Sequence, residues 1–94
     1  MQYVIIARDY PNGFEKRQQH RAAHLEGAEQ LKKEGKLLYA VALVENGQMK
    51  GSIMVMNFNT RAELDAYKAK EPYITGGVWE SVEISECAVP PLFS

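Results

Sequence analysis

Hydrophobic residues follow two kinds of pattern along the chain, and these patterns predict six elements. Short apolar runs rich in β-branched residues predict strands, and apolar residues that recur every three or four positions predict helices. The predicted strands span residues 3–7, 36–44, 49–58 and 78–84. The predicted helices span residues 14–34 and 59–71, and the tail from residue 85 to 94 is predicted to be extended.

The two middle strands are joined by the strongest hairpin signal in the chain. Asn46-Gly47 lies between two apolar runs, and both residue types readily adopt the positive φ that a two-residue hairpin turn requires. Gly51, inside the second of these strands, indicates a bulge or a close approach of another backbone. The middle of the chain is therefore predicted to be an antiparallel hairpin.

The second predicted helix has clear signals at both ends. Thr60 and Glu63 have the spacing of a capping box at its start. Pro72 ends it, because the residue before a proline disfavours the α region. Residues 73–77 are then predicted to form a connecting loop.

The first predicted helix carries an apolar stripe. On a helical wheel, Phe14, Ala22 and Ala28 fall close to Leu25. This stripe predicts the face of the helix that packs on the sheet. Since all four residues are apolar, the pattern is that of an ordinary amphipathic helix.

Arg17, Arg21 and His24 lie along one flank of that stripe. Two arginines in such a place are most simply a solvated basic edge beside the core. A lone histidine beside an apolar stripe is most simply a hydrogen-bonded structural group. His20 lies further round the helix and is predicted to be exposed.

The order strand, helix, strand, strand, helix, strand predicts an α+β, ferredoxin-like split βαβ fold. In this fold a four-stranded antiparallel sheet carries both helices on one face. The first three strands are apolar on both faces, yet two helices cover only one. We therefore expect a second copy of the sheet to cover the other face, which gives a homodimer with a barrel-like interior. The length of 94 residues predicts a single domain over residues 1–94.

Composition excludes several classes of function. The formal net charge is −1, from 11 Lys and Arg against 12 Asp and Glu, which gives no basic patch for nucleic acid. Neither a signal peptide nor a membrane-spanning run is evident, so a cytoplasmic location is expected. Cys87 is the only cysteine, which precludes an intrachain disulfide, and it is predicted to be a small buried hydrophobe rather than a nucleophile.

His24 and Glu71 are the two residues whose chemistry stands out. Glu71 immediately precedes Pro72, which stiffens the backbone around it. A carboxylate that accepts from one imidazole nitrogen fixes the tautomer and leaves the other nitrogen for proton transfer. His20 and His24 lack the glutamate that a zinc-binding HExxH motif places between them, so no metal and no cofactor are expected. Sequence spacing alone leaves open whether His24 and Glu71 meet.

Four segments resemble the YCII-related family of small proteins. They are residues 21–25, 35–38, 51–52 and 71–84, and the resemblance extends over nearly the whole chain, from about residue 3 to residue 84. The resemblance implies a ferredoxin-like fold that forms dimeric α/β barrels. It also implies a histidine–aspartate dyad in a pocket near the sheet. His24 and Ser52 match the family histidine and serine, and Glu71 stands where the family has aspartate.

Three functions remain as hypotheses. In the first, the protein is a cofactor-independent lyase, isomerase or hydrolase in which His24 transfers a proton and Glu71 orients it. Polar groups of the substrate would be bound by four side chains, namely Ser52, Tyr73, Arg21 and Arg17. In the second, the protein is a non-catalytic small-ligand-binding or dimeric interaction module. A haem or oxygen-handling relative is the third, and it has no dedicated sign in the sequence.

Overall fold

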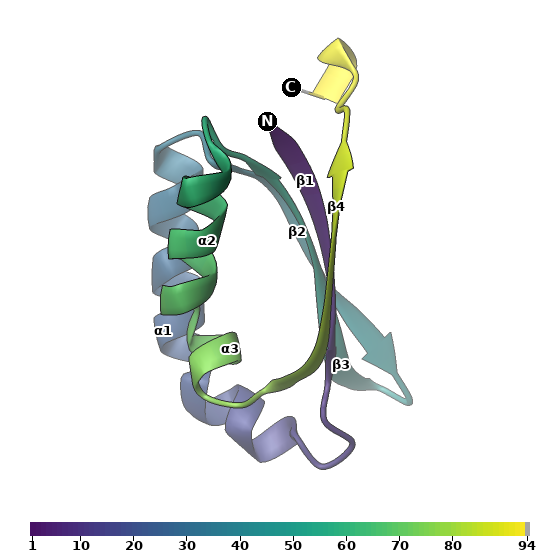
Figure 1. Ribbon diagram of the computed structural model, residues 1–94. Helices are drawn as coiled ribbons and strands as arrows, with labels where there is room; N and C mark the ends of the chain where they lie inside the picture. The colour runs from purple at the N-terminus through teal and green to yellow at the C-terminus, as the bar shows by residue number, and fades with distance from the viewer. Residues whose placement is uncertain (94) are drawn as a thin grey trace.

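The four strands form one antiparallel sheet in the order β2-β3-β1-β4 (Figure 1). The computed structural model describes residues 1–93. Its strands are β1 (Gln2–Asp9), β2 (Leu37–Glu45), β3 (Gln48–Asn57) and β4 (Trp79–Cys87). Its helices are α1 (Phe14–Lys33), α2 (Arg61–Lys70), the single turn α3 (Pro72–Thr75) and the 3-10 turn η1 (Pro91–Phe93).

This topology confirms the predicted ferredoxin-like fold. The crossovers β1-α1-β2 and β3-α2-β4 each place one strand between the two that they join, so β1 and β3 become the central strands. Figure 1 shows both long helices on one face of the sheet. Within the described residues, no element covers the opposite face.

The core lies between the helices and the sheet. Along β1, Tyr3, Ile5 and Ala7 point to the helices and are almost completely buried. Their neighbours Val4 and Ile6 point to the open face and are only partly buried. The prediction of a strand with two apolar faces therefore holds, but one chain buries only one of them.

The prediction for the buried face of α1 is wrong for Phe14, Ala22 and Leu25, and it holds for Ala28, which is partly buried against the core. Leu25 is 46% exposed and Phe14 is 36% exposed, whereas the buried residues of α1 are Arg17 and His24. Hydrogen bonds engage Arg17 Nη1 and Nη2 and His24 Nδ1, so burying these polar groups costs less free energy than the helical wheel assumes. His20 is partly buried rather than exposed, and it lies so close to Gly76 that a Cβ there would be 2.5 Å from His20 Nε2.

The hairpin between β2 and β3 forms as predicted. Asn46 has φ 52° and Gly47 has φ 78°, which is the pair of positive values that a type I′ turn requires. Both expectations for Gly51 are met. The β2–β3 register shifts beside it, between Leu43 and Val44, and a Cβ on Gly51 would lie 2.5 Å from the carbonyl oxygen of Ala7.

The segment after α2 differs from the prediction. Thr60 caps α2 by accepting from the backbone N–H of Glu63 at 3.3 Å, as expected. Pro72 ends α2 but also begins α3, so most of the predicted loop is one turn of helix. Proline suits this first position because its φ is already helical and its missing N–H has no partner to lose.

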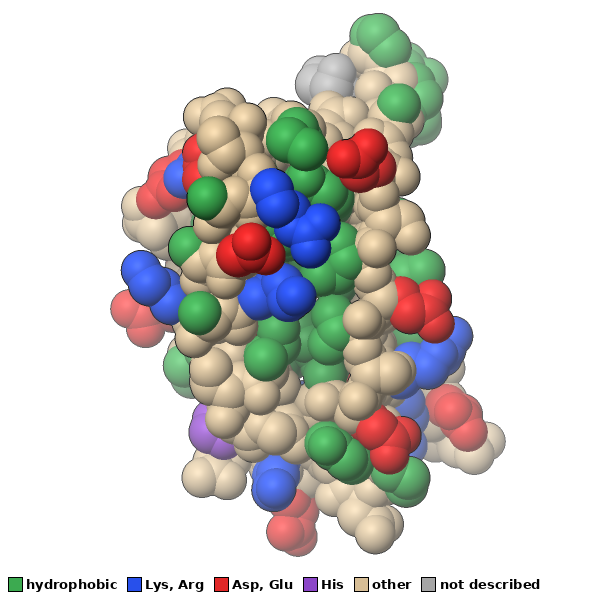
Figure 2. Space-filling model, in the orientation of Figure 1, with side chains coloured by type: hydrophobic (Ala, Val, Ile, Leu, Met, Phe, Trp, Pro, Cys, Tyr) green, Lys and Arg blue, Asp and Glu red, His purple; other side chains and the backbone are tan. Residues whose placement is uncertain are grey.

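The C-terminal part also differs. Strand β4 extends to Cys87, and η1 follows where an extended tail was predicted; residue 94 lies outside the described residues. Cys87 is partly exposed rather than buried. None of the helices within residues 1–93 is both long and apolar enough to cross a membrane. Figure 2 shows acidic and basic side chains interspersed on the visible face, with hydrophobic side chains in the seam between the helices and β4.

We predict that Gly51→Ala lowers the free energy of unfolding by about 1–3 kcal/mol, because the new Cβ would overlap the Ala7 carbonyl oxygen. Gly27→Ala is the matched control, since no atom lies within 4 Å of a Cβ built there. In the interior of α1 it should raise stability by up to about 1 kcal/mol. Urea denaturation of both variants measures the difference, and equal stabilities would contradict the close approach at Gly51.

Candidate active site

His24 and Glu71 are in direct contact. The distance from His24 Nδ1 to Glu71 Oε1 is 2.5 Å, and the two residues are 9% and 5% exposed. An ionised carboxylate can only accept, so it selects the tautomer in which Nδ1–H donates. Nε2 is then the nitrogen left for another partner.

The backbone fixes Glu71 in this position. Glu71 has an extended conformation between α2 and α3 and serves as the N-cap of α3. Its Oε1 accepts the backbone N–H of Tyr73 at 3.1 Å, in addition to the histidine. Pro72 fixes the first turn of α3, and Glu71 directly precedes it. The carboxylate is therefore positioned by the segment that resembles the family motif.

Aromatic rings hold the plane of the imidazole. Tyr73 stacks on His24, with ring centroids 3.9 Å apart and an interplanar angle of 8°. Trp79 meets His24 edge-on at 6.1 Å. Rotation of the imidazole would disturb both contacts and the bond to Glu71, so the ring is positioned on three sides.

Arg17 is tied into a second buried network. Its Nη1 donates to both carboxylate oxygens of Asp9, at 3.0 and 3.2 Å, and its Nη2 donates to Ser52 Oγ at 3.1 Å. The guanidinium carbon also lies 4.9 Å from the centroid of the Tyr73 ring. At 3% exposed, Arg17 is not the solvated edge that its position on the wheel suggested.

Electrostatics in this network favour a neutral Tyr73 and make the ionisation of Asp9 less favourable. Burial raises the pKa of the Asp9 carboxyl, and the Arg17 charge opposes that rise. Burial also raises the pKa of the Tyr73 hydroxyl, against the lowering effects of Arg17 and Arg21. Tyr73 therefore keeps its proton at neutral pH and can donate a hydrogen bond.

A pocket of about 160 Å³ brings together five of the six predicted site residues. They are Arg17, Arg21, His24, Ser52 and Tyr73, and apolar side chains of β2 and β3 complete the wall. Arg21 is exposed at the rim. Glu71 does not line this pocket and lies behind His24.

Sequence reasoning missed Asp9 and Trp79. Asp9 directly follows the apolar part of β1 and lies eight residues before Arg17, and this acid at a strand end was the available signal. Trp79 lies within residues 71–84, which carry the family resemblance, but nothing else in the sequence assigned it to the site. Within residues 1–93, Trp79 Nε1 and Arg17 Nε are buried donors without a hydrogen-bond partner, and the same part of the chain contains no cluster of three or more potential metal ligands.

Comparisons with known proteins found a matching family and similar sequences. The model of the YCII-related domain matches residues 1–88. The chain is 33% identical to Protein YciI of Escherichia coli O6:H1 over 91 residues, which covers 89% of this chain and 93% of that protein. It is 34% identical to an uncharacterized protein of Haemophilus influenzae over 89 residues, covering 87% and 91% of the two chains.

Solved structures share the fold. A 5-chloro-2-hydroxyhydroquinone dehydrochlorinase from Burkholderia phenoliruptrix, in complex with 2,5-dihydroxybenzoquinone, superposes with a TM-score of 0.87. Its sequence is 21% identical, and the match covers all of both chains. An antibiotic biosynthesis monooxygenase matches with a TM-score of 0.56 at 18% identity, over 96% of this chain and all of the other.

We predict that Asp9 and Arg17 stabilise the fold only as a pair. Asp9→Ala should lower the free energy of unfolding by about 3–5 kcal/mol, because it leaves the Arg17 charge buried without its carboxylate. The double variant Asp9→Leu with Arg17→Met should regain most of that loss. Urea denaturation of Asp9→Leu, Arg17→Met and the double variant gives the coupling energy, and simple additivity of the two changes would contradict the prediction.

Proposed function

The chain belongs to the YCII-related domain family, and from that premise we propose that it is a small-molecule enzyme using His24 as its acid–base group. The observation that carries the proposal is the hydrogen bond from His24 Nδ1 to Glu71 Oε1. With Nδ1 engaged, Nε2 is the nitrogen available to the pocket. The reaction class is a cofactor-independent lyase, isomerase or hydrolase.

Glu71 supports proton transfer in two ways. Its carboxylate orients the imidazole, and its charge stabilises the imidazolium that forms when Nε2 accepts a proton. Compared with aspartate, glutamate adds one methylene. The extra length does not prevent contact, because Oε1 lies 2.5 Å from the imidazole while the residue also caps α3.

An elimination illustrates the chemistry. His24 Nε2 takes a proton from the substrate, the electrons of the broken bond form a double bond, and the leaving group departs with its electron pair. The imidazolium then returns its proton to solvent or to the product. His24 Nε2 carries the proton in both steps of this elimination, so the reaction needs no cofactor.

Three polar groups are suited to bind the substrate. Ser52 Oγ accepts from Arg17, so its own hydrogen is free to donate to a substrate oxygen. The neutral hydroxyl of Tyr73 is a second donor. Arg17 is held by Asp9 and Ser52, so Arg21 at the rim is the cation best placed to attract an anionic substrate.

The substrate class we propose is a small ring compound that carries oxygen substituents. A pocket of about 160 Å³ favours a single ring over anything larger. The dehydrochlorinase of similar fold, which was solved with a dihydroxybenzoquinone, supports this choice. Hydroxyl and carbonyl oxygens on such a ring match the donors that the pocket presents.

We also propose that the protein works as a homodimer whose subunits meet through the open face of the sheet. Val4 and Ile6 of β1 pair there with Val55 and Ile53 of β3, and none of the four is covered by a helix. On the edge strand β2, Val41 is 45% exposed. Contiguous apolar surface of this kind commonly marks an interface between proteins.

Chlorinated hydroxyhydroquinones are the first substrates to assay. If one is turned over, we expect His24→Gln to reduce kcat/KM by roughly 100- to 10,000-fold, as for loss of a general acid–base group. Glu71→Gln should cause a smaller loss. His20→Gln is the matched control, because His20 lies one turn away on α1 and does not line the pocket. Full activity of His24→Gln would refute the assignment, and ring compounds that bind without turnover would favour a non-catalytic binder.

The dimer is tested by light scattering at micromolar concentration. The wild-type protein should have twice the mass of one chain, and Val55→Glu should have the mass of one chain, because it places a charge in the centre of the proposed interface. Ala69→Glu on the exposed surface of α2 should remain dimeric. A wild-type protein with the mass of one chain would exclude the dimer.

A further inference from the structure

A second and larger cavity lies between α1 and α2, outside the pocket of His24. Its volume is about 370 Å³, which is within the range of sites for small organic ligands. We call it the interhelical groove. Leu31, Phe58 and Tyr67 contribute apolar and aromatic walls, and the small residues Gly27 and Ala66 leave the space between the helices open.

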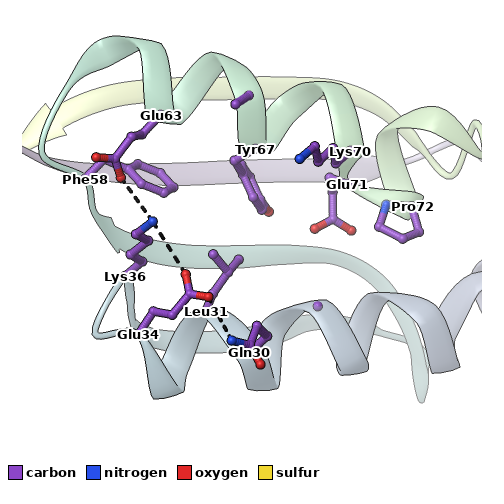
Figure 3. A pocket seen from close by; sticks show the side chains of 12 residues that line it. Gln30, Leu31, Glu34, Lys36, Phe58, Glu63, Tyr67, Lys70, Glu71 and Pro72 are labelled. Carbon is purple, nitrogen blue, oxygen red and sulfur yellow. Dashed lines mark hydrogen bonds and ion pairs between the residues drawn. The ribbon is translucent and has the colours of Figure 1, made fainter.

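One end of the groove is closed by compensated charges. Lys36 Nζ lies 3.5 Å from Glu34 Oε1 and 3.3 Å from Glu63 Oε2, and Figure 3 shows these three side chains together. A cation held between two carboxylates has little attraction left for a ligand. Gln30 also donates to Glu34 Oε2, at 2.8 Å, so the other polar side chains of the groove are at its opposite end.

The other end is formed by Glu71 and Lys70. Figure 3 shows the Glu71 carboxylate pointing into the space between the helices, with Lys70 beside it. Both hydrogen bonds of Glu71 to His24 and to the Tyr73 backbone use Oε1. The Tyr67 hydroxyl lies close to the same carboxylate, and burial together with the Glu71 charge raises the pKa of Tyr67.

Glu71 therefore connects two cavities. It lines the interhelical groove but not the pocket, whereas His24 lines the pocket but not the groove. The hydrogen bond between them is the link. A group that donates to Glu71 from the groove would withdraw electron density from the carboxylate and weaken its interaction with the imidazole.

The charges at this end select the ligand. Lys70 and Glu71 lie side by side, so their opposite charges largely cancel and give a charged ligand no net attraction to offset the loss of its hydration. A neutral hydroxyl can donate to Glu71 without that cost. Between the two ends, Phe58, Tyr67 and Leu31 favour a flat apolar body.

We propose that the interhelical groove is a second ligand site, which binds a small neutral aromatic molecule through a hydroxyl group donated to Glu71. Binding there is transmitted to His24 through the shared carboxylate. The site is independent of the proposed enzymatic function, because no group of the groove has to react. A ligand bound in the groove acts on His24 without occupying the pocket.

Phenol is the probe for this site. Titrated into the 15N-labelled full chain and followed by NMR, it should give saturable shifts at the amides of Leu31, Ala66 and Tyr67, and a shift of the His24 ring signals. Benzoate and benzylamine, which have similar size but opposite charges, should bind more weakly. Shifts confined to residues around Ser52, or no saturable shifts up to the solubility limit of phenol, would overturn the proposal.

Two variants separate the groove from the pocket. Ala66→Phe fills the groove from the exposed surface of α2 and should weaken phenol binding at least about tenfold. Ala69→Phe is the matched control, since Ala69 is exposed on the same helix outside the groove, and it should bind phenol as the wild type does. Unchanged affinity in a folded Ala66→Phe protein, verified by its thermal unfolding, would refute the site.

A third variant distinguishes this proposal from the enzymatic one. His24→Gln removes the proposed acid–base group but keeps every residue that lines the groove. Phenol should still shift the groove amides, and its affinity should equal or exceed that of the wild type, because the competing hydrogen bond from His24 to Glu71 is gone. Loss of phenol binding in this variant would mean that the probe occupies the pocket of His24. The two proposals can therefore fail separately.

Discussion

A single carboxylate oxygen, Oε1 of Glu71, joins three parts of the molecule. It accepts from the imidazole on α1 and from the backbone N–H of Tyr73 in α3, while the residue itself terminates α2. Each of these contacts satisfies a polar group that burial would otherwise leave unpaired. This oxygen therefore ties α1 to the junction of α2 and α3 and orients the imidazole that lines the pocket.

The ferredoxin-like fold was predictable because its determinants are local. Apolar runs, the Asn46-Gly47 turn and the Thr60 cap each act over a few residues, and each is found where the sequence indicated. The inward face of α1 was not predictable in the same way. A wheel scores Arg17 as polar, and its burial depends on Asp9 and Ser52, whose positions are set by the tertiary structure.

The two cavities differ in what sequence could indicate about them. The pocket of His24 was accessible to prediction, because its residues are chemically distinctive and resemble a family motif. Its geometry was not, since His24 and Glu71 are 47 residues apart. The interhelical groove is formed by missing volume at Gly27 and Ala66, and small residues on a helix surface look the same in sequence whether they face a cavity or solvent.

The double use of Glu71 has a consequence for reading related sequences. A hydrogen-bond acceptor at this position caps α3 whether or not the protein catalyses a reaction. Selection for folding alone would therefore preserve it in a descendant that had lost activity. His24 caps no helix, so among diverging relatives the histidine is the position whose replacement would mark the loss of the reaction.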